Sequence, residues 1–234
     1  MNQTTKAVGR IIVAVVLGIL VLGVSSSVAI VISKRFPGLE RSLPMGEGFL
    51  VQVGILFLSV LLIVAISKGQ FSRYGFRIGD NIQLPRIVIL GLAVGFASSL
   101  AGLAAPGGIP QPAYNSFFDL IIGVWILASI AEEVLTRGLI QGFLSPLTGL
   151  GFSIGRLRIS LPVLISAIFF GLMHLGLLST GANLIAVTIL VIFAFILGIV
   201  AGYYREKSES LIPAIIVHMC GNAGGWLAEA LLNI

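Results

Sequence analysis

Long stretches without a charged residue follow one another along the chain and alternate with short polar connections. They cover residues 11–33, 48–67, 87–105, 120–131, 159–175, 183–204 and 210–228. Most reach the roughly 20 residues that an α-helix needs to cross a bilayer core. The strictly alternating pattern of a transmembrane β-barrel is absent, because runs such as residues 60–66 contain no polar position. The pattern predicts an all-α, multipass transmembrane helical bundle of about seven spans (seven or eight).

Composition supports this interpretation. Hydrophobic residues make up 57% of the 234-residue chain and charged residues 10%, which excludes a soluble globular protein. The single cysteine excludes a disulfide framework and a cysteine-based structural zinc site. No internal repeat or low-complexity linker divides the chain, so we expect residues 1–234 to form a single integral-membrane domain. Residues 145–155, rich in Gly and Ser, are expected to be a flexible connection.

The basic residues are spread over the connections, so the net charge of +5 does not indicate a nucleic-acid partner. With seven spans, one side holds Lys6, Arg10, Lys68, Arg73, Arg77, Arg86, Arg156, Arg158, Arg205 and Lys207, and the other holds Lys34, Arg35 and Arg41. Basic residues concentrate in cytoplasmic loops. We therefore predict that the protein lies in the cell membrane with its N-terminus on the cytoplasmic side. The first span could instead be a cleaved signal peptide. Residues 68–81 interleave aromatic and basic residues, which favours a membrane-surface anchor.

Few ionisable residues interrupt the apolar spans, and each is a functional candidate because such groups are unfavourable in a bilayer. They are Glu132, Glu133 and Arg137 in the fourth span, His174 in the fifth, and His218 in the seventh, where Asn222 follows four residues later. Counted at 1.5 Å per residue, Glu132, His174 and Asn222 fall within about one helical turn in depth, and His218 lies about one turn nearer the cytoplasmic edge. The sequence therefore predicts that three helices bring a polar set into one membrane layer.

Helix geometry separates the two glutamates. Glu133 and Arg137 are four residues apart and should form an ion pair, whereas Glu132 points about 100° away. Glu132 with His174 could orient a water molecule and accept its proton, while His218 and Asn222 could donate hydrogen bonds to an oxyanion. This chemistry is amide hydrolysis in a cavity reached from the cytoplasmic side. The alternative is a buried polar cluster that only fixes helix packing.

Three ordered motifs resemble a known family. Glu132-Glu133-x3-Arg137, Phe170-x3-His174 and His218-x3-Asn222, on successive apolar helices, are similar to those of the CAAX prenyl protease and bacteriocin-processing (Abi) family of intramembrane endopeptidases, which includes Ras-converting enzyme. The resemblance covers a catalytic core at about residues 117–222, and the first three spans carry no matching motif.

The resemblance implies a role for each site residue. Glu132 and His174 would activate water, His218 and Asn222 would form the oxyanion hole, Glu133 and Arg137 would brace the site, and Phe170 would pack its wall. The substrate would be a prenylated CAAX-type peptide or another membrane-protein substrate in the lipid bilayer. No cofactor is expected; zinc held by Glu132, His174 and His218 is the alternative. Cys220 is interpreted as a packing residue.

Two other functional classes use the same residues. A membrane scaffold or bacteriocin-immunity factor would keep the polar set for structure alone. Proton-coupled transport would also need intramembrane Glu and His, but the duplicated halves common in transporters are not apparent.

Overall fold

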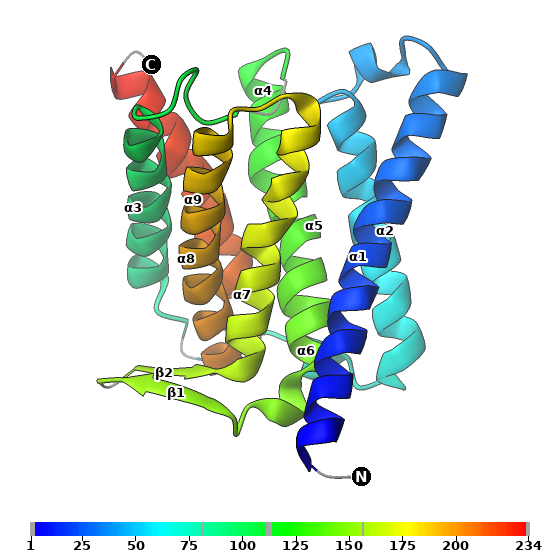
Figure 1. The fold of residues 1–234 in the computed structure, drawn as a ribbon, viewed down its shortest axis with the longest axis vertical. Helices are drawn as coiled ribbons and strands as arrows, with labels where there is room; N and C mark the ends of the chain where they lie inside the picture. Colours follow the sequence, from blue (N-terminus) through cyan, green and yellow to red (C-terminus); the bar gives the residue numbers. More distant parts are fainter. Residues whose placement is uncertain (1–2, 81, 111–113, 156, 233–234) are drawn as a thin grey trace.

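The computed structural model describes residues 3–80, 82–110, 114–155 and 157–232. Within these residues, six helices are long and apolar enough to cross a membrane. They are α1 (Gln3–Arg35), α2 (Glu47–Ser67), α3 (Leu84–Gly102), α7 (Leu161–Met173), which a 3₁₀ segment continues over His174–Thr180, α8 (Leu184–Ser208) and α9 (Ile212–Leu232). They stand side by side with the two chain ends at opposite ends of the bundle (Figure 1). The predicted all-α multipass membrane fold is confirmed.

A further helical column runs through the middle of the bundle and corresponds to the predicted fourth span (Figure 1). It consists of three short α-helices, α4 (Phe117–Asp119), α5 (Ser129–Glu133) and α6 (Gln141–Phe143). Two π-helical segments, Leu120–Ala128 and Val134–Ile140, join them without a break. Because π-helical turns often occur at functional sites, this irregular column is where chemistry is most expected.

The connection after α6 differs from the flexible loop that its composition predicts. A 3₁₀ turn over Ser145–Leu147 leads into an antiparallel hairpin of β1 (Gly151–Ile154) and β2 (Leu157–Ser160). Ser160 pairs with Gly151 at the end of the hairpin and also caps α7, since its hydroxyl accepts a hydrogen bond from Val163 N. The hairpin therefore fixes where α7 begins.

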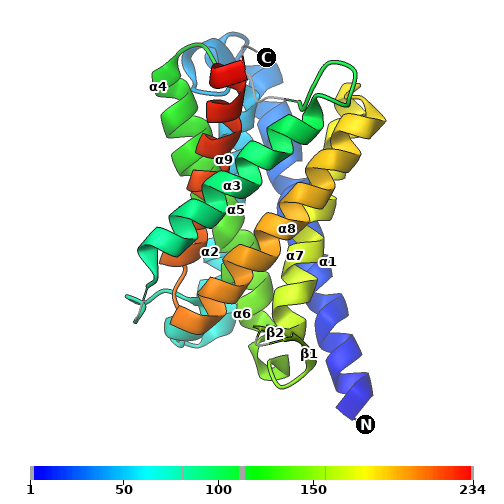
Figure 2. The same ribbon diagram turned by 90° about the vertical axis from the view of Figure 1, so that its left-hand side faces the viewer.

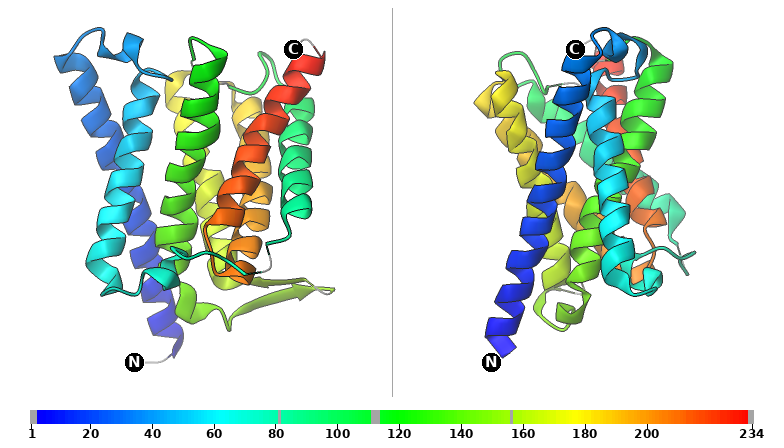
Figure 3. Two further views of the ribbon diagram at one scale, coloured as in Figure 1. Left: turned by 180° about the vertical axis from the view of Figure 1, so that it is seen from behind. Right: turned by 90° about the vertical axis from the view of Figure 1, so that its right-hand side faces the viewer.

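Glycines allow α3 and α9 to pack closely at one edge of the bundle. A Cβ at Gly95 would overlap the carbonyl group of Gly221, and one at Gly224 would overlap that of Leu92. Figure 2 faces this edge, with α3 nearest the viewer, and Figure 3 shows α1 and α2 at the opposite edge. The small residues therefore serve packing within the chain, and they set the position of α9.

Candidate active site

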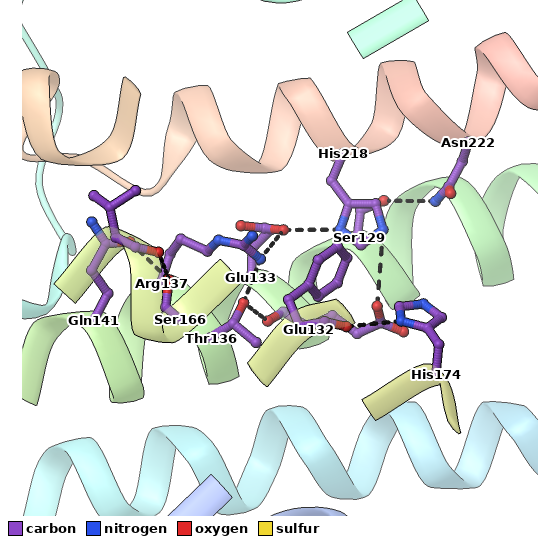
Figure 4. Close-up of polar contacts among 12 residues, drawn as sticks. Ser129, Glu132, Glu133, Thr136, Arg137, Gln141, Ser166, His174, His218 and Asn222 are labelled. Atoms are coloured by element: carbon purple, nitrogen blue, oxygen red, sulfur yellow. Dashed lines mark hydrogen bonds and ion pairs between the residues drawn. The ribbon is translucent and has the colours of Figure 1, made fainter. Parts of the chain in front are cut away.

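The two glutamates of the central column are both withdrawn from the protein surface. Glu132 is 8% exposed and Glu133 is fully buried. Both belong to α5, the α-helical stretch between the two π-helical segments. Figure 4 shows them between α9 on one side and α2 on the other. The column thus carries both carboxylates into the interior of the bundle.

Glu133 lies at the centre of a buried ion-pair network. Arg137 Nη1 donates a hydrogen bond to Glu133 Oε1 at 2.9 Å, which confirms the predicted pairing. The same oxygen lies 3.0 Å from His218 Nδ1. Thr136 Oγ1 joins the network by accepting from Arg137 Nη1 and donating to the carbonyl oxygen of Glu132. Glu133 is therefore neutralised by Arg137 and sets the orientation of His218.

Arg137 fits in the core because a neighbouring helix has no side chain at the contact. Its guanidinium is fully buried and lies over the ring of Phe170, with Cζ 4.5 Å from the ring centroid. A Cβ at Gly198 of α8 would come within 2.8 Å of Arg137 Nη2. Glycine at this position therefore makes room for the buried cation.

Glu132 has different partners. Gln52 of α2 donates a hydrogen bond from Nε2 to Glu132 Oε1 at 2.8 Å. The other oxygen, Oε2, lies 3.9 Å from His218 Nε2. Sequence reasoning missed Gln52, although it is the only carboxamide in the apolar stretch 48–67, and that isolation was a usable signal. The two carboxylates thus sit in different environments.

His174 follows directly after α7, at the start of the 3₁₀ segment. Its Nδ1 lies 2.8 Å from the carbonyl oxygen of Phe170. Because a carbonyl only accepts, Nδ1 carries the hydrogen, and Nε2 of the neutral ring is left as an acceptor. In the view of Figure 4 the half-buried ring points toward the Glu132 side chain. No direct hydrogen bond joins His174 to Glu132 within the described residues.

Phe170 packs against both histidines of the candidate site. Its ring meets the rings of His174 and His218 edge-on, with centroids 5.2 Å apart in each case. The three rings therefore form one packed unit, and they hold the histidines of α7 and α9 on either side of the same aromatic residue.

Asn222 ties α9 to the central column. Its Nδ2 donates to the carbonyl oxygen of Val124 and to Ser129 Oγ, both at 3.1 Å. Cys220 lies on the part of α9 that faces α3, because a Cβ at Gly91 would contact its side chain. Asn222 and His218 thus face the column, while Cys220 faces elsewhere.

Several polar atoms of the site are buried without a hydrogen-bond partner among the described residues: Glu133 Oε2, Arg137 Nε, Arg137 Nη2 and Gln52 Oε1. A buried ionic cluster is a weak source of stability, since well-packed apolar residues often serve as well or better. Buried polar groups that keep unused hydrogen-bonding capacity call for an explanation. A catalytic role supplies one.

The residues do not assemble into a metal site as they stand. Within the described residues, no group of three or more His, Cys, Asp and Glu side chains is placed to hold a metal ion. In the zinc alternative, Glu132, His174 and His218 would be the ligands. Nδ1 of each histidine has a protein partner, so Nε2 would be the atom that binds the ion.

The fold and the site together define an integral multipass membrane protein with a buried carboxylate and histidine centre. Residues 114–224 match the family described as Rce1-like, type II CAAX prenyl endopeptidase Rce1-like. This match confirms the resemblance that the motifs indicate. It spans all the motif residues, whereas α1, α2 and α3 lie outside it. No curated protein and no solved structure matches the chain.

Proposed function

We propose that the protein hydrolyses a peptide bond in a lipidated or membrane-embedded substrate, with a water molecule activated by Glu132 and His174. The observation that carries this proposal is the unequal environment of the two glutamates. Glu133 is held by Arg137 and His218 at hydrogen-bond distance. Within the described residues, Glu132 accepts a hydrogen bond from the neutral Gln52 side chain, and its other oxygen lies 3.9 Å from His218 Nε2. Glu132 therefore keeps an oxygen available to act as a general base.

The expected reaction begins with a water molecule near Glu132 Oε2. Glu132 accepts a proton as the water oxygen attacks the peptide carbonyl carbon, and His174 Nε2 accepts a hydrogen bond that orients the water. The tetrahedral intermediate then collapses as the C–N bond breaks, and Glu132 returns the proton to the leaving amine nitrogen. All protons are accounted for without a further reactant.

His218 can stabilise the oxyanion only in its charged form. Nδ1 is turned to Glu133, so Nε2 must also carry a proton to donate a hydrogen bond. Glu133 accepts the hydrogen bond from Nδ1 and so fixes the orientation of the ring, as the aspartate of a catalytic triad does. Glu133 and Arg137 thereby act through His218 as positioning residues.

Asn222 needs a local rearrangement to serve as the second donor. Both of its amide hydrogens are engaged, by Val124 and Ser129. Substrate binding would have to displace one of these bonds for Asn222 to donate to the oxyanion. Movement of the Leu120–Ala128 π-helical segment would do this, because Val124 lies in it.

We further propose a substrate class and an orientation. The substrate is a prenylated CAAX-type peptide or another membrane-protein substrate, as the family description suggests. The catalytic core at about residues 117–222 belongs to one integral-membrane domain, needs no cofactor, and opens to the cytoplasmic side of the cell membrane. The distribution of basic residues supports this orientation.

Cleavage of a farnesylated CAAX peptide by purified protein tests the proposal. Glu132→Gln keeps the size and hydrogen-bonding capacity of the side chain but cannot accept the proton, so we expect activity to fall about 10²- to 10⁴-fold. Cys220→Ala, on α9 but facing α3, is the matched control and should retain activity. Full activity of well-folded Glu132→Gln and His174→Ala variants would show that the polar set is structural.

A further inference from the structure

A polar hollow of about 550 Å³ opens at the end of the bundle where α8 turns into α9. Three arginines from separate segments line it: Arg73 in the 3₁₀ turn Phe71–Tyr74, Arg77 shortly after that turn, and Arg205 near the end of α8. Ser72, Ser145 and Thr148, which carry hydroxyl groups, also line it. Cations and hydroxyl donors that converge on one hollow are the groups that bind phosphate.

The acidic residues of the hollow already have partners. Glu209 pairs with Arg77 at 2.6 Å, and Glu206 accepts a hydrogen bond from Ser160 at 2.6 Å. Arg73 donates from Nε to Ser145 Oγ and forms no ion pair within the described residues. Arg73 therefore retains its charge at the mouth of the hollow.

Among the described residues, Arg205 is the one buried arginine of the hollow, and Glu206 and Glu209 act on it electrostatically. Its side chain is only 6% exposed, yet it forms no ion pair in the described part of the chain. Nη2 donates to the carbonyl oxygen of Arg73 at 2.6 Å, while Nε is buried without a partner. A buried guanidinium with an unused donor is unfavourable unless an acceptor completes its hydrogen bonds.

An apolar groove of about 300 Å³ borders the same segment. Its lining is Val60, Ile63, Val64, Phe71 and Phe76. Phe71 and Phe76 thus line the groove. Arg73, between them in sequence, and Arg77, directly after Phe76, line the hollow. A ligand that fills both has an anionic head and a hydrocarbon chain.

We propose that these two surfaces together bind one anionic phospholipid, with its phosphate at Arg73 and Arg205 and part of an acyl chain along Phe71 and Phe76. A free phosphate ion would use only the hollow. The arrangement also agrees with the membrane-surface position that the interleaved aromatic and basic residues of this segment indicate.

Such a lipid would be coupled to the start of α9. Leu211 N donates to the carbonyl oxygen of Gly75, and Ser210 Oγ donates to that of Arg77. A lipid that holds the segment around Arg73 would therefore steady the first turn of the helix that carries His218. This inference does not depend on the proposed peptidase activity.

Lipid binding to the full chain in detergent tests the proposal without any cleavage assay. We would add phosphatidylglycerol, phosphatidylcholine or inorganic phosphate and follow thermal unfolding and native mass spectra. Phosphatidylglycerol should raise the unfolding temperature and remain bound, and the other two should do so much less. Equal effects of the two phospholipids, or full reproduction of the effect by inorganic phosphate, would overturn the proposal.

Variants locate the site. Arg73→Gln should weaken phosphatidylglycerol binding about fivefold, and Arg86→Gln, an exposed arginine outside the hollow, should not. Phe76→Ser should weaken lipid binding through the groove alone. Unchanged lipid binding in folded Arg73→Gln protein would overturn the headgroup assignment, and unchanged binding in Phe76→Ser would overturn the acyl-chain assignment. Arg205 is left intact because replacing this buried side chain would also disturb the fold.

Discussion

Gln52 Nε2 donates a 2.8 Å hydrogen bond to Oε1 of Glu132 and thereby joins α2 to the central column. Gln52 lies outside the segment that matches the endopeptidase family, whereas Glu132 lies inside it. The N-terminal helices are therefore more than a membrane anchor for the family domain. One of them supplies the hydrogen bond that orients the proposed general base.

Replacing Gln52 tests this positioning role. In Gln52→Met the hydrogen bond to Glu132 is lost at nearly constant volume, and we expect kcat for peptide cleavage to fall about 10- to 100-fold, the usual range for a hydrogen bond to a charged group. KM should change little, because Gln52 acts through Glu132. Ser59→Ala is the control on the same helix, since Ser59 Oγ is buried without a partner in the described residues. An equal loss in both variants would indicate a general effect on α2.

Arg137 is expected to matter for stability. Arg137→Met would leave the buried Glu133 carboxylate without its cation, and we expect a loss of about 3–5 kcal/mol in the free energy of unfolding. Adding Glu133→Gln should recover part of this loss, because the unpaired charge is then removed. Denaturant unfolding in detergent measures the free energy of unfolding of both variants. If the double variant is no more stable than Arg137→Met, the ion pair is not the cause.

The close approach of α3 and α9 depends on glycine. Gly95→Ala places a methyl group on the carbonyl of Gly221, so we expect overpacking to destabilise the protein by about 1–3 kcal/mol. Gly23→Ala in α1, where a Cβ would meet nothing within 4 Å, is the matched control and should be neutral or stabilising. Thermal unfolding of the two variants side by side gives the comparison, and equal unfolding temperatures would contradict the packing account.

Metal chelation distinguishes metal-free water activation by Glu132 from a zinc-dependent mechanism. Because we propose water activation by Glu132 without a metal, peptide cleavage should be unchanged after prolonged treatment with EDTA or phenanthroline. The purified enzyme is assayed before and after dialysis against the chelator. Loss of activity that added zinc restores would replace our mechanism with one based on Glu132, His174 and His218 as ligands.

Local spacing was enough to predict part of the site. Glu133 and Arg137 are four residues apart, and they form the expected ion pair even though a π-helical segment begins directly after Glu133. This prediction concerns neighbours on one stretch of helix, where the backbone alone fixes which side chains meet.

Hydrophobic patterning alone determined that this chain is a helical membrane protein, because only helices and closed barrels satisfy the backbone in lipid and the alternating pattern of a barrel is absent. The order of its motifs also indicated the family. Only the tertiary structure decided that Gln52 binds Glu132, that His218 turns to Glu133, and that Asn222 donates to Val124 and Ser129. Contacts between helices depend on their rotation, tilt and separation. These are set by close packing at residues such as Gly95 and Gly198, and the periodicity of any single segment does not contain them.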